Sequence, residues 1–253
     1  MKKTTLGLIL GNINPGFEFD ITQGVNKYAQ EHGINIITFV STAPSKDSFI
    51  SDYIFDSYKL IGIDALVIIY GSLTMFKNNS EIKDGDLILF DLGAQNNYYN
   101  ADITRTFPVN GVFSERQKEV YNAVLRVNER VIKTIKPGLE YKELNKMATE
   151  WIAEECINLG LIKDKKEVSK YYWHSIGHSL GLDTHDISNK DRNTIFKEGM
   201  VWTVEPGIYI EEESIGIRIE DDVLITSDGV QVLTKDMIKT VEDIEEFMKK
   251  TNK

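Results

Sequence analysis

Three of the four histidines in the chain fall within residues 174–186, which read HSIGHSLGLDTHD. A single buried histidine is usually a core residue with its hydrogen bonds satisfied. Three of them close together, in a chain otherwise nearly free of histidine, favour metal binding or proton transfer. Whatever this chain folds into, it has to hold His174, His178 and His185 in one small region.

Carboxylates at predicted strand ends are the candidate companions of these histidines. Asp91 and Asp102 lie eleven positions apart on the two strands of a predicted hairpin, so the turn between them lets the carboxylates converge. Taken alone, aspartates in such turns more often cap loops than bind metals. Glu205 stands in TVEPG, where a proline ends the strand, and in GIRIEDD strand alternation places Arg218 and Glu220 on one face.

The alternative for this last motif is a solvated strand face, with the arginine in a surface salt bridge that contributes little stability. Against it, the other face is apolar, which indicates a buried strand, and buried carboxylates need cations. Four carboxylates and one imidazole suit two divalent ions, and mainly oxygen ligands favour Mn, Co, Fe or Zn. The acidic residues that could form the solvated face are Glu211, Glu212, Glu213, Asp221 and Asp222.

The pattern of apolar residues predicts a mixed α+β fold. Residues 5–74 alternate short apolar runs with helical spacing, as in a βαβαβ unit with a parallel sheet, and Gly33 suits the left-handed end of its first helix. Further on, Ser114 and the glutamine three positions later form a predicted capping box for a long helix that breaks at Pro137. A second helix follows over 141–159 and is closed by Gly160, and an acidic helix comes near the end of the sequence.

Composition excludes some function classes. The net charge of −10 argues against a nucleic-acid surface, which needs clustered lysine and arginine. The apolar runs are too short for a membrane helix. The lone cysteine, Cys156, cannot form an intrachain disulfide and is predicted to be a core residue, which fits a cytoplasmic location.

Two resemblances to known families follow from these motifs. Residues 5–74, with LGLILGNINPGFEFD and IGIDALVIIYGSLT, resemble the start of the Lac-repressor and periplasmic sugar-binding fold. Residues 80–234 resemble the Xaa-Pro aminopeptidases and prolidases of the pita-bread, M24-type metallopeptidases, through DLGAQNNYYNADITRTF, HSIGHSLGLDTHD, VWTVEPGIYI and GIRIEDDVLIT. That second resemblance implies hydrolysis of peptide bonds next to proline by a hydroxide that bridges two divalent ions.

The same resemblance implies roles for single residues. One ion would be bound by Asp91 and the other by His178 and Glu205, with Asp102 and Glu220 bridging both. Glu205 would also shuttle a proton to the leaving amine. His185 would contact the substrate, His174 would line the pocket, and Arg218 would orient the bridging carboxylates.

We therefore predict two domains, a βαβαβ segment over 1–76 and the second half of a pita-bread metallopeptidase over 77–253. Nothing in the first segment resembles the family's first half, and strand edges left exposed there favour a homo-oligomer. The alternatives are a catalytically inactive metal-binding remnant and a binding or sensory protein that works through the N-terminal segment.

Overall fold

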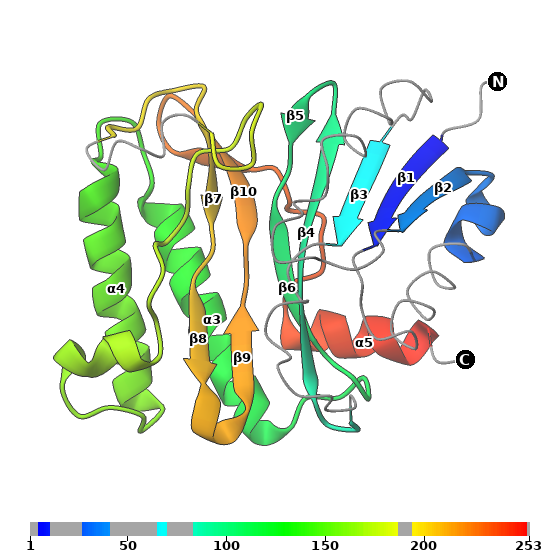
Figure 1. The fold of residues 1–253 in the computed structure, drawn as a ribbon. Coiled ribbons are helices and arrows are strands. Elements are labelled where there is room, and N and C mark those ends of the chain that lie inside the picture. Colours follow the sequence, from blue (N-terminus) through cyan, green and yellow to red (C-terminus); the bar gives the residue numbers. More distant parts are fainter. Residues whose placement is uncertain (1–4, 11–26, 41–64, 70–82, 187–193, 252–253) are drawn as a thin grey trace, which may run out of the picture. The chain divides into compact units, whose positions relative to one another are not determined.

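The computed structural model describes residues 5–10, 27–40, 65–69, 83–186 and 194–251 (Figure 1). The chain forms two compact units. The first comprises Met1–Ser80 and Asp91–Ala101, and the second comprises Glu81–Phe90 and Asp102–Lys253.

Parallel strands form the centre of the first unit, as the sequence predicts. Strand β1 (Thr5–Leu10) pairs in parallel with both β2 (Asn35–Val40) and β3 (Ala65–Ile69). Residues 27–32 are helical, and Gly33 ends this helix with φ +67°, the left-handed conformation expected there. The beginning of this helix and the second helix of the predicted βαβαβ unit lie outside the described residues.

The hairpin that carries Asp91 closes through a tight turn. Strand β4 (Leu87–Asn96) pairs antiparallel with β3 and with the short β5 (Tyr99–Asn100). Asn97 and Tyr98 between them both have positive φ, of 50° and 67°. Two consecutive positive φ values are the mark of the turn type that suits the twist of antiparallel strands.

In the described part of the second unit, three α-helices follow the signals predicted from the sequence. Helix α3 (Glu115–Thr134) begins at the capping box formed by Ser114 and Gln117, and its valines face the core. Helix α4 (Tyr141–Asn158) is followed by Gly160 at φ +75°, and α5 (Val241–Thr251) is the predicted acidic helix. The buried valines of α3 are Val120, Val124, Val127 and Val131.

Short strands complete the second unit. Strand β10 (Asp221–Ile225) lies between β7 (Val201–Val204) and β11 (Val230–Val232) in an antiparallel sheet. Strands β8 (Gly207–Ile210) and β9 (Ile215–Arg218) form a hairpin, with the 3₁₀ turn η3 (Glu211–Glu213) between them. A second 3₁₀ helix, η1 (Lys165–Lys170), follows α4, and β6 (Ile103–Pro108) pairs with β4.

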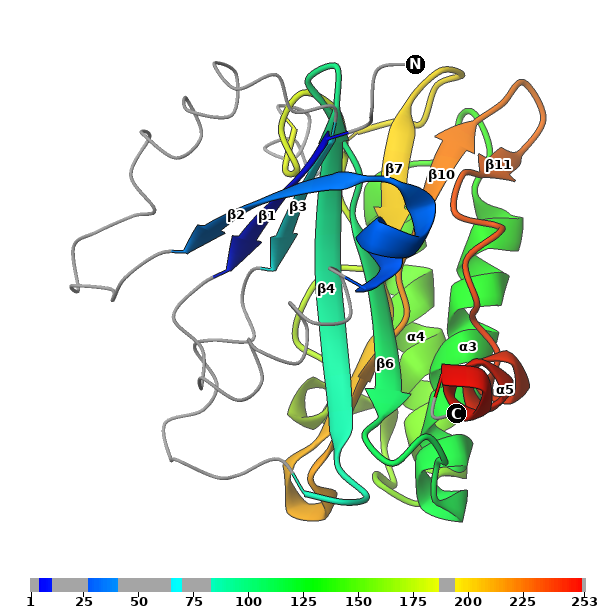
Figure 2. The ribbon, with the colours of Figure 1, turned by 90° about the vertical axis from the view of Figure 1, so that its right-hand side faces the viewer.

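The core of the second unit lies between these strands and α3. Helices α3 and α4 lie together on one side of β7 and β10 (Figure 2), and α3 contacts β7, β8 and β9. Trp202 on β7 and Tyr121 on α3 are among the largest fully buried side chains. Cys156 is also buried, as predicted. Within the described residues, no helix has the length and apolar character needed to cross a membrane.

Candidate metal centre

Asp102, His178 and Glu220 come together in the second unit. Each offers one ligand atom, and these atoms lie within 4.8 Å of one another. All three residues are buried. They come from three separate segments: the residue before β6, the loop before β7, and the junction between β9 and β10. Two carboxylates and an imidazole at this separation form a suitable group for a divalent cation.

The backbone of the histidine stretch is held against β7. The N–H of His178 donates to Thr203 Oγ1 at 3.0 Å, and the carbonyl of His178 accepts from the N–H of Thr203 at 2.8 Å. This close approach requires a glycine at the preceding position, because a Cβ on Gly177 would lie 2.0 Å from the carbonyl oxygen of Thr203. The glycine of the HSIGHS motif therefore allows the backbone at His178 to lie directly against β7.

The imidazole of His178 presents one nitrogen to the carboxylates. Its Nδ1 lies 3.1 Å from the carbonyl oxygen of Ser179, which can only accept, so Nδ1 carries a proton. Its Nε2 lies 3.5 Å from Asp102 Oδ2 and 3.7 Å from Glu205 Oε1. A backbone acceptor on one ring nitrogen is the usual arrangement for a histidine that binds a metal through the other.

The electrostatics of the group also favour a cation. Burial alone would lower the pKa of His178, but Asp102 and Glu205 outweigh this effect and raise the pKa above its ordinary value. Burial raises the pKa of the neighbouring Asp222 to about 7, and the charge of Asp102 adds to the increase. Asp222 Oδ1 is buried without a hydrogen-bond partner among the described residues. This concentration of buried negative charge suits bound positive charge.

The other two histidines of the stretch lie beside this group. The ring of His185 packs edge-on to that of His178, with 4.3 Å between centroids, and His185 is the more exposed of the two. His174 Nδ1 lies 4.0 Å from Glu205 Oε2. Burial lowers the pKa of both His174 and His185, which keeps these imidazoles neutral near pH 7. The three histidines predicted to share one region do share it.

Hydrogen bonds connect Arg218 to the group in two directions. Its Nε donates to Thr104 Oγ1 at 3.0 Å, and the Thr104 hydroxyl donates to Glu220 Oε2 at 2.6 Å. Its Nη1 lies 3.2 Å from the hydroxyl of Tyr209, which in turn lies 2.8 Å from His174 Nε2. Arg218 therefore contacts Glu220 through one hydroxyl and His174 through another.

The sequence motifs did not indicate several of these residues. Thr104 and Tyr209 contact the predicted site residues. Both lie within quoted motifs, DLGAQNNYYNADITRTF and VWTVEPGIYI, but neither residue type singles itself out there. Glu220, Asp221 and Asp222 are buried, at 1%, 1% and 3% exposure, so the alternative of a solvated strand face is wrong for this motif. Asp91 lies on β4 in the first unit, and its role as a ligand stays a prediction.

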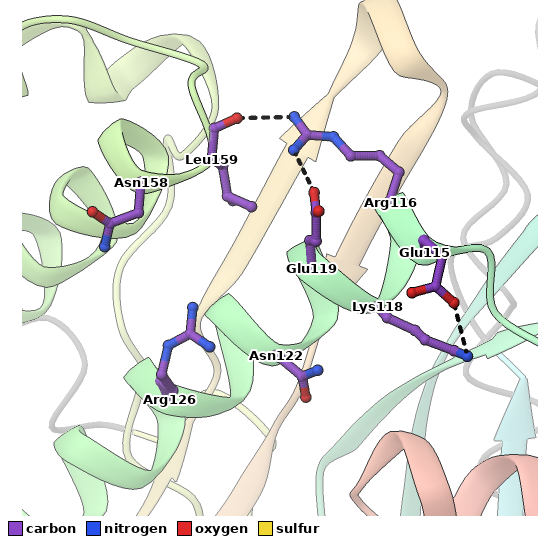
Figure 3. Close-up of a pocket in the computed structure, with 8 residues that line it drawn as sticks. All are labelled: Glu115, Arg116, Lys118, Glu119, Asn122, Arg126, Asn158 and Leu159. Carbon is purple, nitrogen blue, oxygen red and sulfur yellow. Dashed lines mark hydrogen bonds and ion pairs between the residues drawn. The ribbon is translucent and has the colours of Figure 1, made fainter.

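The surface hollow drawn in Figure 3 is a different place. It measures about 600 Å³ and lies between the first turns of α3 and the end of α4. Its side chains are mostly charged and pair with each other, such as Arg116 with Glu119 at 3.0 Å and Lys118 with Glu115 at 3.4 Å. None of its lining residues is a predicted site residue.

Two buried carboxylates and an imidazole, held at strand ends of a mixed α+β unit, form a group that could hold a divalent cation. The sequence pattern of metallopeptidase family M24 matches residues 6–227. This chain belongs to that family.

Similar proteins support this assignment. The chain is 40% identical over 189 residues to the Xaa-Pro aminopeptidase of Haemophilus influenzae, covering 68% of this chain and 44% of that protein. It is 36% identical over 236 residues to Xaa-Pro aminopeptidase 3 of Rattus norvegicus, covering 85% and 47%. A putative aminopeptidase P from Bacillus anthracis superimposes with a TM-score of 0.67 at 36% identity, covering 98% of this chain and 70% of that one.

Zinc-substituted aminopeptidase P of E. coli, in complex with product, superimposes with a TM-score of 0.65 at 36% identity, covering 79% of this chain and 51% of that one. These likenesses confirm the predicted pita-bread, α+β fold. The chain spans about half the length of the curated relatives it matches. The resemblance of residues 5–74 to a sugar-binding domain finds no support, since the family pattern itself begins at residue 6.

Proposed function

We propose that this protein hydrolyses peptide bonds next to proline, with two divalent metal ions as cofactors. The observation that carries the proposal is the buried group of Asp102, His178 and Glu220, whose ligand atoms lie within 4.8 Å of one another. Membership of a metallopeptidase family and the Xaa-Pro aminopeptidases among its relatives support the choice of reaction. Asp91 and Glu205 complete the proposed ligand set.

The donor set suits Mn, Co, Fe or Zn, because carboxylates predominate and a single imidazole joins them. When bound, such ions act as Lewis acids toward a carbonyl and lower the pKa of water. The protein's part is to hold the ligands in place. Arg218 orients Thr104, and the Thr104 hydroxyl in turn donates to Glu220 Oε2. The proposed role of Arg218, to orient a bridging carboxylate, thus acts through Thr104.

Proton transfer falls to Glu205 in this proposal. Its carboxylate keeps 17% exposure and lies near both His178 and His174, so it can exchange protons while remaining beside the ligands. The neutral imidazole of His174 accepts the hydrogen bond of Tyr209 and lines the pocket. His185 lies beside His178 and is more exposed, which suits contact with a bound peptide.

The substrate class is also a proposal, and it is based on the Xaa-Pro aminopeptidases among the similar proteins. We propose peptides with proline in the second position, or Xaa-Pro dipeptides, as substrates. Nucleic acid is not a proposed partner, since the net charge is −10. A cytoplasmic location, a homo-oligomeric state and the domain boundary at residue 76 stay predictions.

The proposal is tested with the full chain, its His178→Ala variant and a matched His32→Ala control. His32 is the fourth histidine and is exposed. Among the described residues, it lies in hydrogen-bond distance of the carbonyl of Tyr28 and stacks on the Tyr28 ring within its own helix. Each protein is titrated with Mn²⁺ and Co²⁺ by calorimetry. The same samples are assayed on Xaa-Pro-Yaa tripeptides, Xaa-Pro dipeptides, and tripeptides with alanine in place of proline.

Metal binding and proline-dependent hydrolysis should be present in the wild type and in His32→Ala, and both should fall in His178→Ala. Metal binding without hydrolysis by the wild type would instead identify an inactive metal-binding protein. Absence of binding in the wild type would refute the metal centre itself.

A further inference from the structure

A buried polar cluster contacts the backbone beside two of the proposed ligands, Glu205 and Glu220. We name it the carbonyl clamp; its members are Arg105, Asn128, Asp221 and Lys239. Asn128, on α3, is fully buried, and Arg105 and Asp221 keep 4% and 1% exposure. Buried charge and amide groups are costly unless paired, and the members of this cluster pair with one another.

Asn128 links the two strand ends that lead into Glu205 and Glu220. Its Nδ2 donates to the carbonyl oxygen of Val204 at 3.2 Å and to that of Ile219 at 3.5 Å. These carbonyls belong to the peptide groups that immediately precede the two glutamates. Asparagine is a poor residue for the middle of a helix, so its place in α3 reflects these tertiary contacts.

Arg105 holds the next peptide group along the chain. Its Nη1 donates to the carbonyl oxygens of Glu220 at 2.5 Å and Thr104 at 2.9 Å, and its Nε donates to that of Ile238 at 2.8 Å. Strand alternation explains this arrangement, because Thr104 and Arg105 point to opposite faces of β6. Thr104 reaches the carboxylate of Glu220, whereas Arg105 reaches only the backbone of that residue.

Asp221 and Lys239 complete the cluster. Asp221 accepts from Arg105 Nη2 at 2.7 Å and from Lys239 Nζ at 2.9 Å, and Lys239 also donates to Asn128 Oδ1 at 3.2 Å. The Thr234 hydroxyl donates to Asp221 as well, at 2.7 Å, but contacts no carbonyl beside a proposed ligand. Arg105 and Asn128 donate to the backbone carbonyls beside the proposed ligands. They are connected to each other through Asp221 and Lys239.

We propose that the carbonyl clamp sets the position of Glu205 and Glu220 relative to each other, with Asn128 and Arg105 as positioning residues that act through backbone carbonyls. This inference rests on the proposed metal centre and adds residues outside the ligand set. The hydrogen bonds described above from Asn128 and Arg105 go to backbone carbonyls beside these glutamates and not to their carboxylates. Its loss should therefore leave every ligand present but shift where two of them lie.

The test compares Asn128→Leu and Arg105→Lys with the matched control Thr234→Val. Asn128→Leu removes both carbonyl contacts while Lys239 keeps its bond to Asp221. Arg105→Lys keeps a cation beside Asp221 but loses the planar fork that reaches two carbonyls at once. Thr234→Val removes one hydrogen bond of the same cluster and leaves Asn128 and Arg105 in place. Each full-length variant is titrated with Mn²⁺ at a temperature where its metal-free form is folded.

Mn²⁺ should bind about tenfold to a hundredfold more weakly to Asn128→Leu and Arg105→Lys, the range typical of residues that orient metal ligands. Thr234→Val should bind Mn²⁺ as the wild type does, even where it lowers the melting temperature. The visible spectrum of bound Co²⁺, which reports coordination geometry, should change in the first two variants only.

Wild-type Mn²⁺ affinity in both clamp variants would overturn the inference while leaving the metal centre intact. Equal losses in all three variants would also overturn it, because they would reflect stability and not position. A wild type that binds no Mn²⁺ would overturn the proposed metal centre and, with it, the role of the clamp. Since two different clamp variants are used, failure of one to fold leaves the other to decide.

Discussion

Thr104→Val is the substitution whose effect the structure specifies most closely. The two side chains have nearly the same shape, so the change removes a hydroxyl without opening a cavity. Thr104 is fully buried, and its hydroxyl donates to Glu220 Oε2 at 2.6 Å and accepts from Arg218 Nε at 3.0 Å. Valine would leave both of these charged groups without this partner.

The expected loss can be estimated from the two bonds. A hydrogen bond to a buried charged group contributes about 1.5–3 kcal/mol, and the bond from the half-buried Arg218 contributes less, about 0.5–1.5 kcal/mol, because water can replace it. The free energy of unfolding of the second unit should therefore fall by roughly 2–4 kcal/mol in the metal-free protein. Mn²⁺ affinity should fall by about tenfold or more, since Glu220 loses the donor that orients it.

The assay is chemical denaturation followed by tryptophan fluorescence. The chain has three tryptophans, Trp151, Trp173 and Trp202, and all lie in the second unit, so the signal reports that unit. Thr234→Val serves as the control because it also removes a hydroxyl bonded to a buried carboxylate, that of Asp221. Unchanged stability and Mn²⁺ affinity in Thr104→Val would refute this account of the Thr104 hydroxyl.

Three further outcomes are expected. Burial raises the pKa of Cys156 to about 12, so the thiol should not react with a disulfide reagent at pH 9 in the native protein and should react fully once it is unfolded. Gly177→Ala should destabilise the fold and weaken Mn²⁺ binding, because its Cβ would lie 2.0 Å from the Thr203 carbonyl oxygen, whereas Gly229→Ala, with open space at its Cβ, should do neither. Removal of bound metal with a chelator should lower the melting temperature, because a ligand at one hundred times its Kd stabilises a folded protein by about 2.7 kcal/mol. An unchanged melting temperature would show that bound metal does not stabilise the fold.

Local signals in the sequence predicted much of this fold. The capping box at Ser114 and the left-handed glycines at Gly33 and Gly160 mark helix ends correctly, because such signals depend on a few neighbouring residues. The histidine stretch was likewise identifiable as one region because its members are close in sequence.

Contacts between distant segments could not be predicted from such local signals. Thr104 and Arg105 meet Glu220 and Asp221 across more than a hundred positions, and nothing in ITRTF reveals which carboxylates it will face. The pair Asp221 and Asp222 looks like a solvated charge run, because burial of acidic residues depends on cations such as Lys239 that arrive from elsewhere in the chain. The sequence alone therefore left a solvated face open as an alternative for this pair.

The wide spacing of the ligand-bearing segments also has a consequence for the order of folding. The bond between Thr104 and Glu220 closes a loop of 116 positions, whereas α3 and α4 are neighbours in sequence and pack on each other. Long loops close late, because their entropy cost comes before any contact is gained. We therefore expect the helical pair to form first and the ligands to converge last, so that the metal enters a nearly finished protein and does not nucleate it, unlike the ion of a small zinc finger.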